Sequence, residues 1–96
     1  MSFALEIRNL IAESIQSSVA QIVEDFEIEG KYNALSTVRA IKVAVASAMK
    51  LSQERRKYID EDKIVTMAQF EMVNALFELQ LESMKRQKDN EAKKRR

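Results

Sequence analysis

The chain has 96 residues, with one Gly and no Pro, Cys or His. This length allows one domain with a small core, and the near absence of chain-breaking residues predicts long helices joined by few turns. Without Cys there is no disulfide or thiol chemistry, and without His the commonest general base and metal ligand is missing. No nucleophile stands beside a base, so we expect no enzyme activity, no cofactor and no metal site.

The net charge of +1 is distributed unevenly along the chain. Residues 85–96 hold seven Lys and Arg against two acidic residues, which gives this segment +5 and leaves −4 for residues 1–84. The apolar pattern also stops near residue 84. The sequence therefore predicts a helical domain over residues 1–86, followed by a basic tail over residues 87–96 that is a frayed helix or disordered.

Residues 3–26 are expected to form the first helix, because apolar side chains recur there at intervals of three and four. This stripe consists of Ala4, Ile7, Ile11, Ile15, Val19, Ile22 and Phe26. Ser2 is the expected N-cap, and Gly30 fits the left-handed position that follows many helix ends. Four acidic residues near this end oppose the helix dipole: Glu24, Asp25, Glu27 and Glu29. These charges predict a frayed last turn and a loop at 27–32. The acidic residues are either a solvated helix end or a docking site for a basic segment, which could be the protein's own tail.

Residues 33–57 are expected to form the second and central helix. Nine of the twelve residues from Ala40 to Leu51 are apolar, which predicts burial on more than one side. One face of this helix holds Val38, Ile41, Val45, Ala48 and Met49. We expect Val45 and Ala48 to be buried.

A break is expected near Asp60, which is a good N-cap, so that the third helix spans residues 61–88. Ile59 and Ile64 stand where a hydrophobic staple would place them. The first of two apolar faces on this helix contains Ile64, Ala68, Met72, Ala75 and Leu79, with Leu76 at its edge. The second contains Phe70, Val73, Phe77 and Met84.

The fold class expected from these patterns is all-α, with three long antiparallel helices joined by short turns. One apolar face of the third helix can pack within the chain. The other, Phe70, Val73, Phe77 and Met84, is predicted to form the interface of a homodimer or higher oligomer, because two Phe side chains are unfavourable in water. The alternative is that both faces belong to one intramolecular core.

Basic residues suggest a second kind of partner. Cations near a helix C-terminus are ordinarily explained by the helix dipole, but they can also contact phosphates. The candidate nucleic-acid contacts are Arg55, Arg56, Lys57, Lys85, Arg86, Lys88, Lys93, Lys94, Arg95 and Arg96. No aromatic residue is interleaved in the tail for base stacking, and the rest of the chain is acidic.

The function expected from the sequence is that of a non-enzymatic interaction protein: a small assembly, adaptor or regulatory factor that binds itself and another protein. The alternative is an oligomeric nucleic-acid-binding protein that uses the basic tail and the basic residues of the second helix. Small helical phage and plasmid proteins, including DNA-packaging terminase small subunits, are similar in general style, but no motif names a family. The longest uncharged stretch has ten residues, about half a membrane span, so we expect a cytoplasmic protein with no membrane partner.

Overall fold

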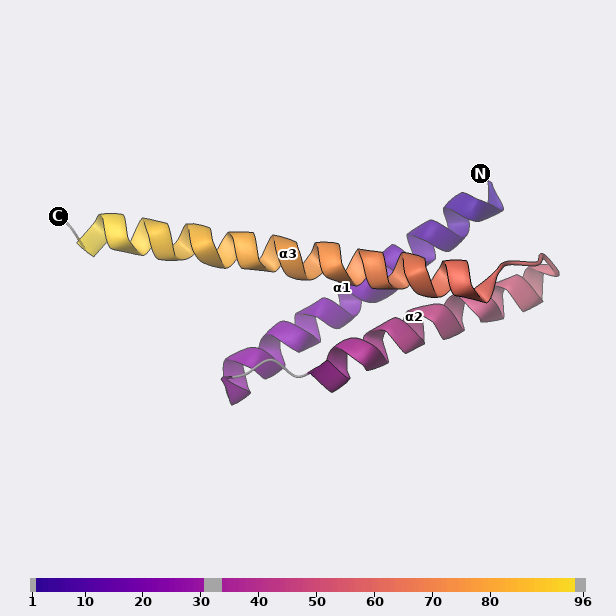
Figure 1. Cartoon of the computed structure of the whole chain (residues 1–96), viewed down its shortest axis with the longest axis horizontal. Helices are drawn as coiled ribbons and strands as arrows, with labels where there is room; N and C mark the ends of the chain where they lie inside the picture. Colours follow the sequence, from indigo (N-terminus) through magenta and orange to yellow (C-terminus); the bar gives the residue numbers. More distant parts are fainter. Residues whose placement is uncertain (1, 31–33, 95–96) are drawn as a thin grey trace.

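A computed structural model describes residues 2–30 and 34–94, without the side chains of residues 83, 86, 87 and 89–94. It contains three helices: α1 (Phe3–Glu29), α2 (Ala34–Arg55) and α3 (Glu61–Lys94). Consecutive helices run antiparallel, and each helix packs against the other two (Figure 1). The predicted fold class is thus confirmed for a single chain. No helix in the described ranges has both the length and the hydrophobicity needed to cross a membrane.

The first helix begins as predicted and ends later than predicted. The Ser2 hydroxyl accepts a hydrogen bond from the Leu5 N–H at 3.2 Å, which is the expected N-cap. Gly30 has φ 72° and its N–H donates to the Phe26 carbonyl at 2.8 Å, which confirms the left-handed C-terminal position. The acidic last turn is nevertheless helical up to Glu29, three residues beyond the predicted end of the first helix at residue 26. The capped Gly satisfies the end of the helix despite the unfavourable charges.

The core is formed where large side chains of α1 meet small side chains of the other two helices. Five residues of the predicted α1 stripe are buried: Ile7, Ile11, Ile15, Val19 and Ile22. They form one cluster with Ala40, Ala44 and Ala48 of α2 and with Ile64, Ala68, Met72 and Ala75 of α3. Small residues at intervals of four on α2 let the bulky α1 stripe approach closely.

The predicted core face of α2 is only partly correct. Ala48 is fully buried, but Val45 is half-buried and Val38 is 46% exposed. The most buried line of α2 instead consists of Ala40, Ala44, Ala48 and Ser52. The physical reason is that only two helices flank α2, so one sector of its surface is covered and the larger apolar residues lie at the rim of that sector.

The turn between α2 and α3 confirms the predicted break. The N–H groups of Arg56 and Lys57 donate to the carbonyls of Gln53 and Ser52 at 3.2 and 3.0 Å, the bonding pattern of a Schellman motif. The Ser52 hydroxyl also donates to the Lys57 carbonyl. Asp60 then caps α3 by accepting a hydrogen bond from the Asp62 N–H at 3.0 Å.

Arg56 occupies the left-handed position of this motif with φ 52°, a conformation that strains a residue with a side chain. Arg56→Gly should raise the free energy of unfolding by about 1 kcal/mol, because the relieved strain exceeds the extra chain entropy that Gly loses. Urea unfolding measures this change. Arg56→Ala is the matched control, since it removes the charge and keeps the strain. Equal stabilisation by both variants would assign the effect to charge.

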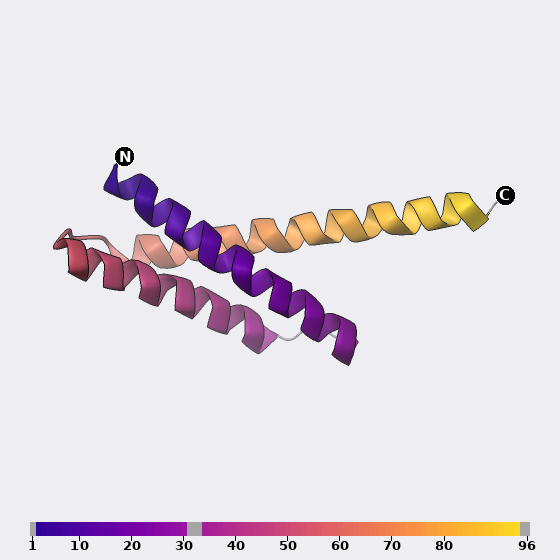
Figure 2. The same cartoon turned by 180° about the vertical axis from the view of Figure 1, so that it is seen from behind.

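The third helix runs well past the other two. Leu79 is the last described α3 residue that packs against the core, and the helix continues to Lys94 rather than to the predicted residue 88. The two opposite views show the C-terminal part of α3 projecting beyond α1 and α2 (Figures 1 and 2). The described chain is accordingly elongated, with extents of 62 × 28 × 17 Å. Residues 80–94, which are 15 of the 34 residues of this helix, therefore contribute no side chain to the core among the described residues.

Candidate interaction surface

An apolar surface follows the side of α3 that faces away from the core, and we call it the α3 seam. It consists of Phe70, Val73, Phe77, Leu81 and Met84, which are 66, 63, 58, 46 and 58% exposed. At about 100° per residue these five side chains lie within about 40° of one line along the helix. The buried residues Ile64, Ala68, Met72 and Ala75 lie on the opposite side.

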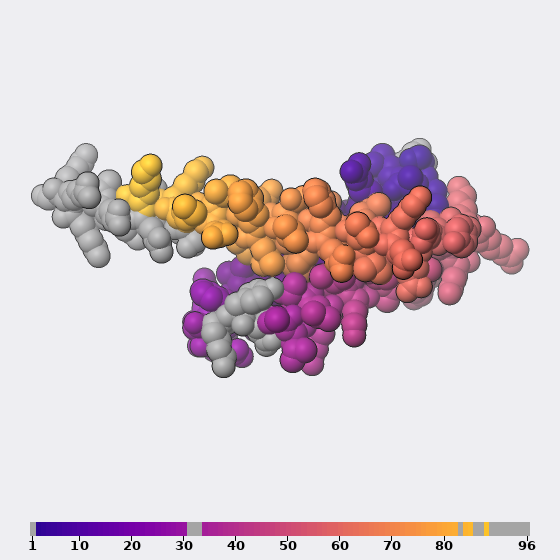
Figure 3. Space-filling model, viewed as in Figure 1, coloured from indigo at the N-terminus to yellow at the C-terminus, as the bar shows by residue number. Residues whose placement is uncertain are grey.

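The four residues predicted as an interface, Phe70, Val73, Phe77 and Met84, are exposed and therefore lie outside the intramolecular core. Whether they form a subunit contact stays a prediction. Leu81 also belongs to the seam, and sequence reasoning missed it although its spacing of four from Phe77 and three from Met84 was visible. Figure 3 shows α3 lying across the other helices and extending beyond them.

Other exposed apolar residues are scattered and do not form a comparable line. Tyr58 lies in the turn before α3, Ile28 lies at the end of α1, and Val43 lies on α2. Single exposed apolar side chains are normal on protein surfaces, whereas a continuous line of large ones indicates an interaction site. The seam is therefore the surface whose exposure needs an explanation.

A shallow groove between α2 and α3 is the second apolar feature, with a volume of about 510 Å³. Val38, Val45 and Met49 line it from α2, and Val65 lines it from α3. Its polar rim includes Lys42 and Glu61.

Among the described residues, no three acidic side chains are close enough together to hold a metal ion.

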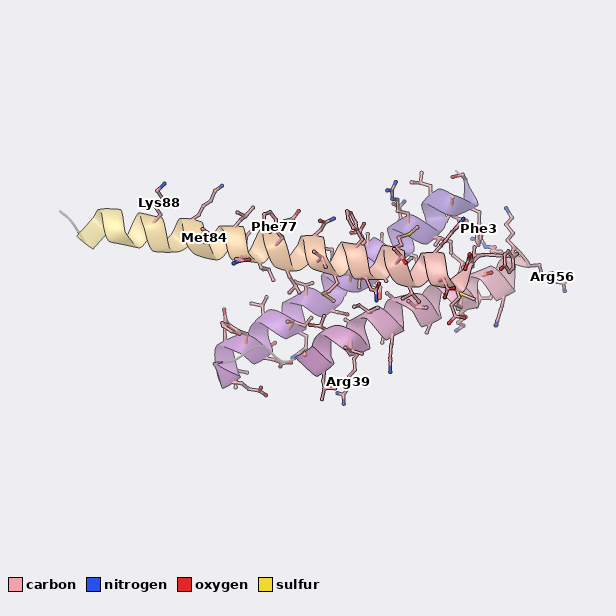
Figure 4. All side chains as sticks on the ribbon, viewed as in Figure 1. Phe3, Arg39, Arg56, Phe77, Met84 and Lys88 are labelled. Carbon is pink, nitrogen blue, oxygen red and sulfur yellow. The ribbon has the colours of Figure 1, made fainter. Side chains whose placement is uncertain are left out.

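The candidate nucleic-acid residues do not form one surface. Arg55, Arg56 and Lys57 lie at the turn between α2 and α3, whereas Lys85 and Lys88 lie on the projecting half of α3, at the other end of the molecule. Figure 4 shows this separation, with Arg56 at one end and Phe77, Met84 and Lys88 in succession along α3. The helix includes Lys93 and Lys94, but the side chains of Arg86, Lys93 and Lys94, and all of Arg95 and Arg96, lie outside the described part.

Two residues of the basic triplet, which consists of Arg55, Arg56 and Lys57, have contacts within the chain. The Arg55 guanidinium donates two hydrogen bonds to the Glu6 carboxylate, at 3.1 and 3.2 Å, which ties the end of α2 to the start of α1. The Lys57 ammonium lies 5.2 Å from the centre of the Phe3 ring, within cation–π range. The sequence separation of 49 residues between Arg55 and Glu6 hid this pair from sequence reasoning.

Comparisons with known proteins identify no relative. A scan of the chain against protein-family models, a search of curated proteins and a search of solved structures each found no match.

Proposed function

We propose that this protein is a non-enzymatic interaction protein that assembles with a second copy through the α3 seam and acts as a small assembly, adaptor or regulatory factor. The observation that supports this proposal is the line of five large apolar side chains on the side of α3 opposite the core. A monomer would keep this line in water along a helix whose residues 80–94 contribute no side chain to the described core.

The energetics favour an interface built by the whole seam. Burying one Phe is worth roughly 1.5–3 kcal/mol, so Phe70 and Phe77 on two chains supply on the order of 6–12 kcal/mol. Association costs about 4–15 kcal/mol, a range that overlaps this gain. The other three seam residues must therefore contribute to a stable dimer.

The test is the mass of the unmodified chain in solution. Sedimentation equilibrium should give about twice the 11.1 kDa of one chain at micromolar concentration, with dissociation on dilution. A mass of 11.1 kDa up to millimolar concentration would contradict the proposal.

A second candidate function is nucleic-acid binding, which the seven Lys and Arg in residues 85–96 favour. The tail begins on a helix that projects from the body, so each dimer would present two basic ends. Binding to random duplex and single-stranded DNA should then weaken steeply as salt rises, because phosphate contacts release counterions. Deleting residues 87–96 should abolish DNA retention at low salt and leave the core helices intact. No binding at low salt by the full chain would remove this candidate.

A further inference from the structure

The α3 seam is symmetric about Phe77. Val73 and Leu81 lie four residues to either side of it, and Phe70 and Met84 lie seven residues to either side. When two identical helices cross antiparallel at one residue, each position faces the position equally far on the other side. Phe77 would then meet its own copy, Val73 would meet Leu81, and Phe70 would meet Met84. Every seam residue would have an apolar partner.

The described part of α3 is centred at nearly the same residue. The helix spans Glu61–Lys94, so its midpoint falls between residues 77 and 78. An antiparallel pair crossing at Phe77 therefore overlaps over the full length of both helices. The projecting residues 80–94 of one copy would lie along residues 60–74 of the other, where α3 is backed by its own core. This overlap would supply the neighbour that the projecting half lacks within one chain.

A parallel pair would also place apolar residues together, but the charges distinguish the two orientations. The exposed acidic residues Asp60, Glu61 and Asp62 begin α3, and four basic residues end the chain at positions 93–96. A parallel pair would place the acidic residues of both copies at one end and the basic residues of both at the other, whereas an antiparallel pair places Asp60, Glu61 and Asp62, together with Lys63, beside the C-terminal residues of the partner copy's α3. The helix dipoles also oppose each other favourably only in the antiparallel pair.

The flank of the seam carries a further complementary pair. Glu71 and Lys85 lie on the same side of the helix, at about 120° and 80° from Phe77 on the wheel. The two-fold axis passes between the two Phe77 residues and is perpendicular to both helices. It therefore places the side of the helix that carries Glu71 and Lys85 along the same edge of the pair in both copies. Glu71 of one copy would then approach Lys85 of the other with an offset of about 3 Å along the axis, and the pair occurs twice. Glu78 lies on the same edge and would approach its own copy, so this edge carries two opposite-charge pairs and one like-charge pair.

The geometry points to an antiparallel, two-fold dimer of α3 helices centred on Phe77, in which the seams of the two copies cover each other and the projecting half of each α3 lies along the first half of the other. This inference rests on the self-association proposed above and adds its orientation and register.

Cysteine cross-linking distinguishes the orientations, because the chain has no Cys of its own. In the antiparallel pair position 73 faces position 81 of the partner, whereas in a parallel pair each of these positions faces its own copy. Packed helix axes lie about 8–10 Å apart, which brings facing Cα atoms of the seam within disulfide range. Two Cys at positions 73 and 81 of one helix are about 12 Å apart and cannot join to each other.

The expected result in a mild thiol–disulfide buffer is a covalent dimer of Val73→Cys/Leu81→Cys, and none of either single variant alone. Mixing the two single variants should give a linked dimer of one chain of each. Covalent dimers of each single variant alone would overturn the antiparallel orientation and leave self-association standing. A non-covalent dimer that forms no linkage in any variant would overturn the register, and a monomeric unmodified chain would overturn the proposed function itself. Should the double variant lose helicity, Phe70→Cys/Met84→Cys repeats the test at the second facing pair.

Discussion

Replacing Phe70 and Phe77 together by Glu should convert the dimer into monomers that remain helical. Both residues are more than half exposed in the single chain, at 66 and 58%, so their replacement leaves the intramolecular core intact. In the dimer, however, the change removes apolar burial of roughly 6–12 kcal/mol across both chains. It also places four carboxylates in the seam without partners, which is strongly unfavourable. Sedimentation measures the mass, and circular dichroism measures the helicity.

The matched control is Val43→Glu/Tyr58→Glu, which introduces the same two charges at residues that are 56 and 92% exposed away from the seam. This control should keep the mass of the dimer. Unfolding of the Phe70→Glu/Phe77→Glu variant would mean that the seam belongs to the core of the fold. An unchanged mass in that variant would place the subunit contact on another surface.

Replacing Ile11 by Ala should lower the free energy of unfolding by roughly 2–5 kcal/mol. The Ile11 side chain is 0% exposed at the centre of the α1 stripe, so its loss leaves a cavity that the packed neighbours fill only in part. Urea unfolding in the monomeric Phe70→Glu/Phe77→Glu background separates this effect from association, which otherwise makes stability depend on concentration.

Ile28→Ala is the matched control for this prediction, because it makes the same chemical change at a residue of α1 that is 75% exposed. It should change the free energy of unfolding by less than about 0.5 kcal/mol. Similar losses in the two variants would contradict the assignment of the α1 stripe to the core.

The sequence predicted the features that are set within a single helix, namely its apolar face and its caps. Five of the seven predicted α1 stripe residues and four of the five residues on the inner face of α3 are buried, because a spacing of three and four places residues such as Ile15 and Met72 on one side of a helix. Ala4 and Phe26, at the two ends of the α1 stripe, are exposed. The caps at Ser2 and Asp60 were predictable because capping depends on local residue chemistry.

The errors arose where the answer depends on neighbouring helices. The second helix is apolar on several sides, so its sequence could not show that the alanine line from Ala40 to Ala48 would be buried while Val38 stayed at the rim. The contact between Arg55 and Glu6 and the separation of the basic triplet from the tail likewise follow from how the helices are arranged in space. The exposed seam was predictable because α3 has two opposite apolar faces, and α1 and α2 together cover only one of them.

Amide hydrogen exchange along α3 at increasing protein concentration tests most directly whether a second copy covers this helix. An isolated helical segment of about 15 residues is marginally stable in water, so the amides of residues 80–94 should exchange quickly in a monomer. If two chains pair through the seam, protection of residues 80–94 should rise with concentration toward that of residues 61–79 and stay low in Phe70→Glu/Phe77→Glu. Fast exchange of residues 80–94 at every concentration, including those at which the chain sediments as a dimer, would contradict pairing through α3.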